Sequence, residues 1–149
     1  MSGILSALDV SASAMTANRQ RMELLVTNIA NSQTTRTPQG GPYQRKDVVF
    51  MSTPIPSFGE VFSHLLEEDG ILEGVRVSEL VVTEAEPILR YDPGHPDADQ
   101  RGFVAYPNIN PIEEMANLMA ATRTYEANVR AFQAVKEIVQ RSIELGRRG

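Results

Sequence analysis

The chain has 149 residues, the size of one ordinary domain, and it contains no Cys, which excludes disulfide bonds and thiolate metal sites. Its net charge of −5 argues against nucleic acid as a partner. No apolar run approaches the roughly 20 residues that a membrane span needs. Asp9 interrupts the first apolar stretch, and no basic residue precedes it, so we expect no cleavable secretory signal. By themselves these features favour a cytoplasmic protein.

The first predicted element is a long helix from Gly3 to Ala30, a stretch without an internal Gly or Pro. Four apolar residues lie seven positions apart within it: Leu8, Met15, Met22 and Ile29. This spacing is typical of a coiled-coil seam. At 1.5 Å per residue the helix is about 40 Å long.

The middle of the chain has shorter elements. Residues 31–42 are polar and rich in turn formers, which predicts an ordered loop or an extended strap. Alternation predicts strands at 75–83 and 87–91, the apolar end of 43–50 resembles a strand, and 103–106 reads as a short extended piece; of these we expect two to four strands to form. A short helix is predicted at 58–68, carrying His64, and a turn between Gly70 and Gly74.

The last predicted element is a second long helix, from Asn110 to Leu145. Asn110 is a good N-cap, and Pro111 suits the first helical position. Gly146 is expected to stop the helix. A second heptad seam follows: Leu118, Tyr125, Phe132 and Val139.

These elements predict a mainly α fold with a small β-rich insert. We expect the terminal helices to pair as an antiparallel coiled-coil hairpin, with residues 1–31 and 107–149 forming a helical core domain and 32–106 a strap and β-rich module. Asn18 and Asn128 occupy seam positions, where a buried Asn fixes register. Both could instead face solvent, because a heptad frame drifts over a straight helix.

One stretch, residues 91–99, could carry chemistry. His95 with Asp92, Asp97 and Asp99 could hold a divalent ion or supply an acid–base pair. The neighbouring Pro and Gly residues favour a structural turn instead. No nucleophile elbow, phosphate loop or dinucleotide fingerprint is present. We therefore predict no catalytic residue, no cofactor and no metal site.

Several motifs resemble those of the bacterial flagellar axial proteins, the family of rod, hook and hook-associated proteins. The signature Asn-apolar-Ala-Asn occurs at Asn28–Asn31. The segments 34–43, 91–98, 106–115 and 123–128 narrow the resemblance to proximal-rod proteins. The matching residues that we single out are Asn28, Ala30, Asn31, Pro38, Gly40 and Tyr43.

The resemblance implies a structural subunit that assembles with copies of itself and other rod proteins into a torque-transmitting helical tube. It implies paired terminal helices that line the tube, export by the flagellar type III apparatus without a cleaved signal, and a periplasmic location in the basal body. An adaptor protein at the MS ring and export gate is a further implied partner. The resemblance implies neither a nucleic-acid partner nor a direct membrane span.

We expect the heptad residues to make the subunit contacts: Leu8, Met15, Met22, Ile29, Leu118, Tyr125, Phe132 and Val139. Asn28 and Asn31 could bridge at the helix end or simply terminate it. Charged residues of the second helix could form lateral ion pairs or a solvated face: Glu113, Glu114, Arg123, Glu126 and Arg130. Two alternative functions are a cytoplasmic coiled-coil adaptor or export chaperone and, from another class, a metal-dependent hydrolase centred on His95.

Overall fold

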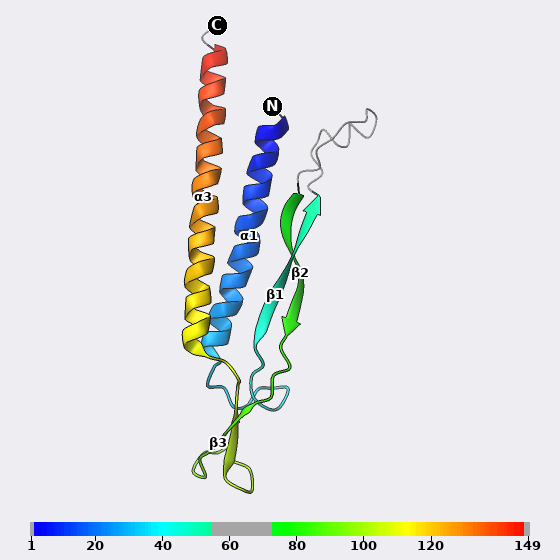
Figure 1. Ribbon diagram of the computed structural model, residues 1–149, viewed down its shortest axis with the longest axis vertical. Coiled ribbons are helices and arrows are strands. Elements are labelled where there is room, and N and C mark those ends of the chain that lie inside the picture. Colours follow the sequence, from blue (N-terminus) through cyan, green and yellow to red (C-terminus); the bar gives the residue numbers. More distant parts are fainter. Residues whose placement is uncertain (1, 55–72, 148–149) are drawn as a thin grey trace. The chain divides into compact units, whose positions relative to one another are not determined.

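The computed structural model describes residues 2–54 and 73–147, which form two long helices and two small sheets (Figure 1). Helix α1 covers Ser2–Ala30 and helix α3 covers Pro111–Arg147. The strands are β1 (Lys46–Pro54), β2 (Glu73–Val82), β3 (Ile88–Tyr91) and β4 (Phe103–Tyr106). The prediction of a mainly helical chain with a small β insert is confirmed, whereas the coiled-coil hairpin stays a prediction. The predicted helix at 58–68, with His64, lies outside the described residues.

Helix α1 has one side that faces solvent. Its exposed residues include Asp9, Thr16, Glu23 and Ala30, which are seven apart and therefore share a face. The predicted apolar residues occupy other positions around the helix. The pattern of apolar and polar residues thus sets which side of α1 faces solvent.

Helix α3 begins as predicted. Asn110 Oδ1 accepts a hydrogen bond from Ile112 N–H at 3.1 Å, and the Asn110 carbonyl accepts one from Glu114 N–H. The first bond satisfies a donor that the first helical turn leaves free, and the second is the first regular bond of the helix. The predicted stop at Gly146 is wrong, because α3 continues to Arg147. Glycine adopts helical as well as left-handed backbone angles, so its presence alone does not end a helix.

The four strands pair in two two-stranded sheets, β1 with β2 and β3 with β4. In the second sheet Leu89 lies opposite Ala105, and Tyr91 lies opposite Phe103. The first predicted strand begins three residues late, at Lys46, because Tyr43 N–H donates to the Thr34 carbonyl within the strap.

The turn predicted between Gly70 and Gly74 falls mostly outside the described residues. Gly74 is buried inside β2, and the next residue, Val75, donates its N–H to Ser13 Oγ at 3.1 Å. Glycine within a strand often marks a place where another part of the backbone approaches closely.

The chain divides into two compact units. One comprises residues 1–20, 50–78 and 122–149, and the other comprises 21–49 and 79–121. Buried apolar residues of the second unit are Leu25, Val104, Ile109 and Ala121, while Ala17 belongs to the first. The boundary falls within both helices and so differs from the division that we predicted by composition, which stays a prediction.

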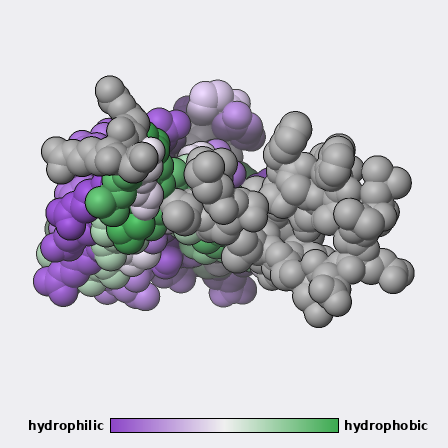
Figure 2. All heavy atoms as spheres, turned by 90° about the horizontal axis from the view of Figure 1, so that it is seen from above, coloured by the Kyte–Doolittle hydropathy of each residue, from purple (hydrophilic) through white to green (hydrophobic). Residues whose placement is uncertain are grey.

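Many hydrophobic side chains reach the surface. Seen from above (Figure 2), hydrophobic residues gather in one part of the face and are bordered by hydrophilic ones. On α3 the exposed large hydrophobic side chains include Ile138, Ile143 and Leu145. Neither long helix is apolar enough over its described residues to cross a membrane.

Candidate functional site: a polar junction around Asn28

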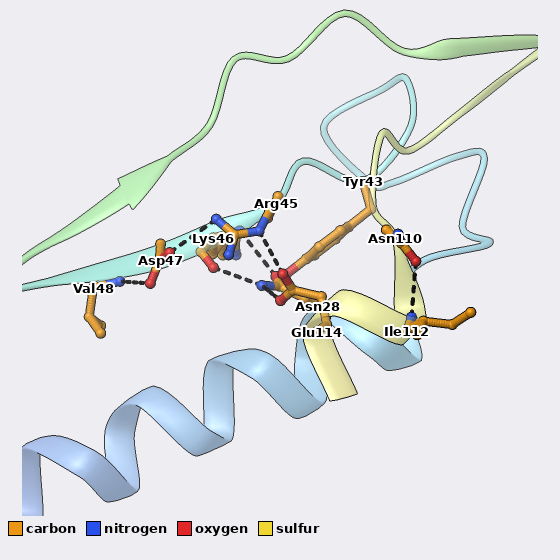
Figure 3. A network of polar contacts seen from close by, with 9 residues as sticks. All are labelled: Asn28, Tyr43, Arg45, Lys46, Asp47, Val48, Asn110, Ile112 and Glu114. Atoms are coloured by element: carbon orange, nitrogen blue, oxygen red, sulfur yellow. Dashed lines mark hydrogen bonds and ion pairs between the residues drawn. The ribbon is translucent and has the colours of Figure 1, made fainter. Parts of the chain in front are cut away.

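Asn28, near the end of α1, is fully buried, and its side-chain amide makes four hydrogen bonds (Figure 3). Its Nδ2 donates to the Lys46 carbonyl at 2.8 Å and to Glu114 Oε2 at 2.9 Å. Its Oδ1 accepts from Lys46 N–H and from Tyr43 Oη, both at 3.0 Å. An amide has two donors and one oxygen with two lone pairs, so every bonding position of Asn28 is used.

Glu114, in the first turn of α3, is the buried charge of this junction. Its side chain is 3% exposed, and Oε1 accepts from Arg45 Nε at 2.8 Å. Arg45 also pairs with Asp47 Oδ2 at 3.0 Å, and Asp47 Oδ1 accepts from Val48 N–H at 2.8 Å. The buried carboxylate is therefore paired with a guanidinium on one oxygen and hydrogen-bonded by a neutral amide on the other. The strap, β1 and both helix ends meet at these atoms.

Two ionisable groups respond to this environment. Burial and the Glu114 charge both raise the pKa of Tyr43 above its usual 10.0, which keeps the phenol protonated and able to donate to Asn28. Burial lowers the pKa of Arg45, but hydrogen bonds and attraction from Glu114 and Asp47 outweigh it, so the pKa rises overall. Both shifts favour the protonation states that the hydrogen-bond pattern requires.

The strap after α1 is held by local hydrogen bonds. Asn31 Nδ2 returns to the Thr27 carbonyl at 2.9 Å, while Asn31 Oδ1 accepts from Thr34 Oγ1 at 3.2 Å. Gly40 and Gly41 have φ angles of 88° and 73°, which favour glycine. Two backbone hydrogen bonds close their turn: Thr37 N–H donates to the Gly41 carbonyl, and Gly40 N–H donates to the Thr37 carbonyl. Of the two roles expected for these residues, bridging applies to Asn28, which connects separate segments. Terminating the helix applies to Asn31.

The family-motif residues are therefore only partly brought together. Asn28 and Tyr43 are in contact, whereas Ala30 and Pro38 are exposed and Gly40 shapes the strap turn. We did not identify Arg45 and Glu114 as a pair from the sequence. Both expectations for Glu114, a lateral ion pair and a solvated position, are wrong because it is buried and paired within the chain. An acid in the first turn of a helix gives no local sign of burial.

The heptad residues have a common environment. All eight, from Leu8 to Ile29 on α1 and from Leu118 to Val139 on α3, are half-buried. The Asn18 amide donates to the Ala14 carbonyl one turn earlier, at 2.9 Å. On the solvent side of α3, Arg130 and Glu126 form an exposed pair at 3.7 Å. Glu113 and Arg123 are exposed as well.

The segment around His95 is tied into a turn. His95 Nδ1 accepts from Asp97 N–H at 3.1 Å, so one ring nitrogen is already engaged. Asp97 accepts from Thr35 Oγ1 at 2.8 Å and lies 3.7 Å from the Arg36 guanidinium. Asp99 Oδ1 accepts from the N–H groups of Arg101 and Phe103, and its pKa is lowered, chiefly by the bond from Phe103. Within the described residues, no group of three or more His or acidic residues is placed to hold a metal ion.

Known proteins are similar to this chain over almost its whole length. Residues 100–145 match the family described as Flagellar basal body rod FlgEFG protein C-terminal. The chain is 39% identical over 145 residues to the flagellar basal-body rod protein FlgC of Bacillus subtilis, covering 94% of this chain and 96% of that protein.

Two further relatives give the same result. The FlgC protein of Aquifex aeolicus is 39% identical over 144 residues, covering 97% of this chain and 98% of that protein. The FlgC protein of Borreliella burgdorferi is 35% identical over 148 residues, covering 96% and 97%. With identity at this level over nearly the full length of several relatives, the chain belongs to the FlgC family of flagellar basal-body rod proteins, and is a structural subunit of that rod.

Proposed function

We propose that the chain assembles with copies of itself and with other rod proteins into the helical tube of the proximal rod, which transmits motor torque. The observation that carries this proposal is the half-buried state of the hydrophobic heptad residues on both long helices. Each square ångström of apolar surface that leaves water contributes about 25 cal/mol, so the remaining exposed area favours further packing. Further apolar surface comes from Ile138, Ile143 and Leu145 on α3. Their exposed fractions are 55%, 57% and 73%.

For the arrangement in the tube, we propose that α1 and α3 pair as an antiparallel coiled-coil hairpin along the inner wall. Residues 32–106 would then lie outside this wall. The proposal is supported by the heptad spacing, which places one apolar residue on the same side of a helix every two turns. Small residues such as Ala17 and Ala121, both 2% exposed, permit close approach of helices.

The polar junction has a mechanical role in this proposal. Asn28 and Glu114 connect the end of α1 with the start of α3, and Arg45 and Lys46 connect both to β1. These bonds are buried or half-buried, so water competes with them only weakly. A junction of this kind resists rotation of the helix ends when the tube is twisted.

We further propose that the chain is exported by the flagellar type III apparatus and is received by an adaptor protein at the MS ring. Export through a narrow channel requires unfolding, which is easier for a chain of low stability. The buried apolar residues of the described part support this, because Ala17 and Ala121 bury little area.

The chain is proposed to act without catalysis. Several atoms that could serve an active site at residues 91–99 are engaged in the turn, among them His95 Nδ1 and Asp97 Oδ2. The alternative of a hydrolase centred on His95 predicts binding of Zn2+, Mn2+ or Ca2+ that a His95→Ala variant loses. Calorimetry on both proteins distinguishes the two functions.

The rod function is tested by changing one heptad residue in a bacterium that lacks its own copy of the protein. Phe132→Glu places a charge on the half-buried seam, whereas Gln133→Glu places the same charge on the exposed neighbour. In isolated basal bodies we expect at least a tenfold loss of the Phe132→Glu protein and normal amounts of the Gln133→Glu protein.

Circular dichroism of both purified variants checks that the helices persist. Ile138→Glu serves as a second variant: Ile138 adjoins the seam residue Val139 and is already 55% exposed, so the change should have little effect on the isolated chain. Normal incorporation of both Phe132→Glu and Ile138→Glu would contradict the proposal. The adaptor or chaperone alternative predicts a discrete soluble dimer in sedimentation and no signal in basal bodies.

A further inference from the structure

One face of the β3–β4 hairpin carries an exposed group of large apolar side chains. Leu89, Tyr91 and Phe103 share this face, because paired residues of a sheet point to the same side and side chains alternate along a strand. Their exposed fractions are 66%, 66% and 38%, whereas Val104 on the other face is fully buried. We call Leu89, Tyr91 and Phe103 the aromatic patch.

The aromatic patch is held in a fixed shape. The Tyr91 and Phe103 rings pack edge to face with centroids 5.4 Å apart. Gly102, with a φ of 82°, lets the Tyr91 ring lie so close that an added Cβ would come within 2.9 Å of it. Asp99 Oδ1 holds the amides of Arg101 and Phe103. A patch that is already ordered loses less entropy when it binds, so this construction suits a docking surface.

The first turns of α3 carry a second exposed apolar group in the same compact unit. Ile112, Met115 and Met119 are 78%, 48% and 60% exposed. Spacings of three, four and seven residues place them on one side of the helix. Glu114 and Ala121, which are buried, point to a different side. We call Ile112, Met115 and Met119 the methionine stripe.

The two surfaces match in size and chemistry. The stripe is about 10 Å long at the helical rise. The patch measures about 7 Å along β3 and about 5 Å across to β4, so one helix covers it. Methionine sulfur makes favourable contacts with aromatic rings. Exposed Arg101, next to the patch in the hairpin loop, also complements exposed Glu113 at the start of the stripe, with Asp92 the nearby like charge.

We propose that the aromatic patch of one copy docks on the methionine stripe of the next copy of this chain. A contact between two different surfaces leaves one of each free on every added copy, so it repeats instead of closing as a twofold dimer. This is the type of contact that a rod requires, and the inference rests on the proposed assembly into a tube.

Cysteine cross-linking tests the contact directly, because the natural chain has no Cys and each introduced thiol is unique. Leu89→Cys and Met119→Cys are produced separately, and also together as two separate chains in one cell. The bacterium lacks its own copy of the protein. Basal bodies are isolated, oxidised and analysed on non-reducing gels. Maleimide labelling of the purified monomers checks that both thiols are accessible. In the matched control, Leu89→Cys is replaced by Glu84→Cys, at an exposed position between β2 and β3.

We expect a covalent dimer when Leu89→Cys and Met119→Cys are made together, at least tenfold more abundant than with either variant alone or with Glu84→Cys. A chain carrying both substitutions should give a ladder of longer oligomers. Dimers from Leu89→Cys alone would overturn the proposal, because they indicate a twofold contact. Incorporated protein without a cross-link between copies, including a link to a different rod protein, also overturns it and leaves the rod function intact. Failure of all variants, including the wild type, to enter basal bodies would instead contradict the proposed assembly on which the inference depends.

Discussion

Asn28 and Glu114 lie 86 positions apart in the chain, and a 2.9 Å hydrogen bond joins Asn28 Nδ2 to Glu114 Oε2 in a buried environment. Both side chains are buried, so water cannot replace the partner that either one loses. Each therefore depends on the other and on the strap residues between them. This relationship makes the junction sensitive to changes that preserve size but alter hydrogen bonding.

Asn28→Ala should strongly destabilise the chain. The change removes four hydrogen bonds. Two of them are the bonds that the Asn28 side chain makes with the N–H and the carbonyl of Lys46. Buried polar groups without partners cost about 1–3 kcal/mol each, so a total loss of about 2–4 kcal/mol is expected. Denaturant unfolding followed by circular dichroism measures it. Gln20→Ala, on the exposed side of the same helix, should change stability by less than about 0.5 kcal/mol.

Asn28→Asp should be worse than Asn28→Ala, although it is nearly the same size as Asn28. The new carboxylate faces Glu114 Oε2 and has no donor for it, so two like charges meet in a buried site. The same unfolding experiment, repeated at neutral and at acid pH, checks the cause. The difference between the two variants should shrink as the pH falls, because protonation removes the repulsion. A constant difference would point to altered packing instead.

Glu114→Gln should lower the pKa of Tyr43 while leaving it above 10.0. Burial is the larger cause of the raised value and remains, whereas the Glu114 charge is removed. A raised pKa means that the Tyr43 contribution to stability is complete below pH 10 and is lost as the pH rises through the folded-state value. Carbon-13 NMR of labelled tyrosine rings, with Tyr43→Phe for assignment, follows the titration. An unchanged Tyr43 pKa would contradict the assigned role of the Glu114 charge.

The turn at Asp99 should weaken in acid. The pKa of Asp99 is lowered, first by the bond from Phe103 N–H, so its contribution is present above about pH 4 and is lost as the pH falls through the lowered value. Amide exchange of Arg101 and Phe103 should accelerate over this range. Asp99→Asn should remove this pH dependence, and persistence of the dependence in that variant would assign it to another carboxylate.

Gly102→Ala should destabilise the hairpin, whereas Gly146→Ala should not. At Gly102 the backbone is left-handed, and the new Cβ would lie 2.9 Å from Tyr91 Cε2 and 3.2 Å from Pro93 Cβ. A strained residue of this kind costs about 1–3 kcal/mol. Gly146 lies in α3 with open space around it, so alanine there should favour the helix by up to about 1 kcal/mol. Thermal unfolding of both variants tests the contrast.

The sequence predicted the regular elements well, because their signals are local. Heptad spacing and the Asn110 cap located α3, and the short extended piece expected at 103–106 is β4, Phe103–Tyr106. The stop predicted at Gly146 was wrong: Gly146 lies inside α3, because a residue without a side chain is permissive and does not by itself end a helix. The cytoplasmic location favoured by composition is wrong, whereas the motif resemblance correctly indicated the flagellar basal body.

The junction could be predicted only in part. Asn28 and Tyr43 stood out through a family motif, but nothing near Glu114 or Arg45 in the sequence indicates that they meet. Their pairing depends on how the strap returns past α1, which is set by contacts between distant residues. Long-range ion pairs of this kind leave no periodic pattern in a single sequence.

The complete pairing of Asn28 has a consequence for how densely the chain can be surrounded. Among the described side chains, no buried nitrogen or oxygen lacks a hydrogen-bond partner. The junction therefore needs no solvent to satisfy it, and neighbouring molecules can exclude water from its surroundings without leaving an unpaired group behind. Dehydration on close crowding should therefore cost this region little.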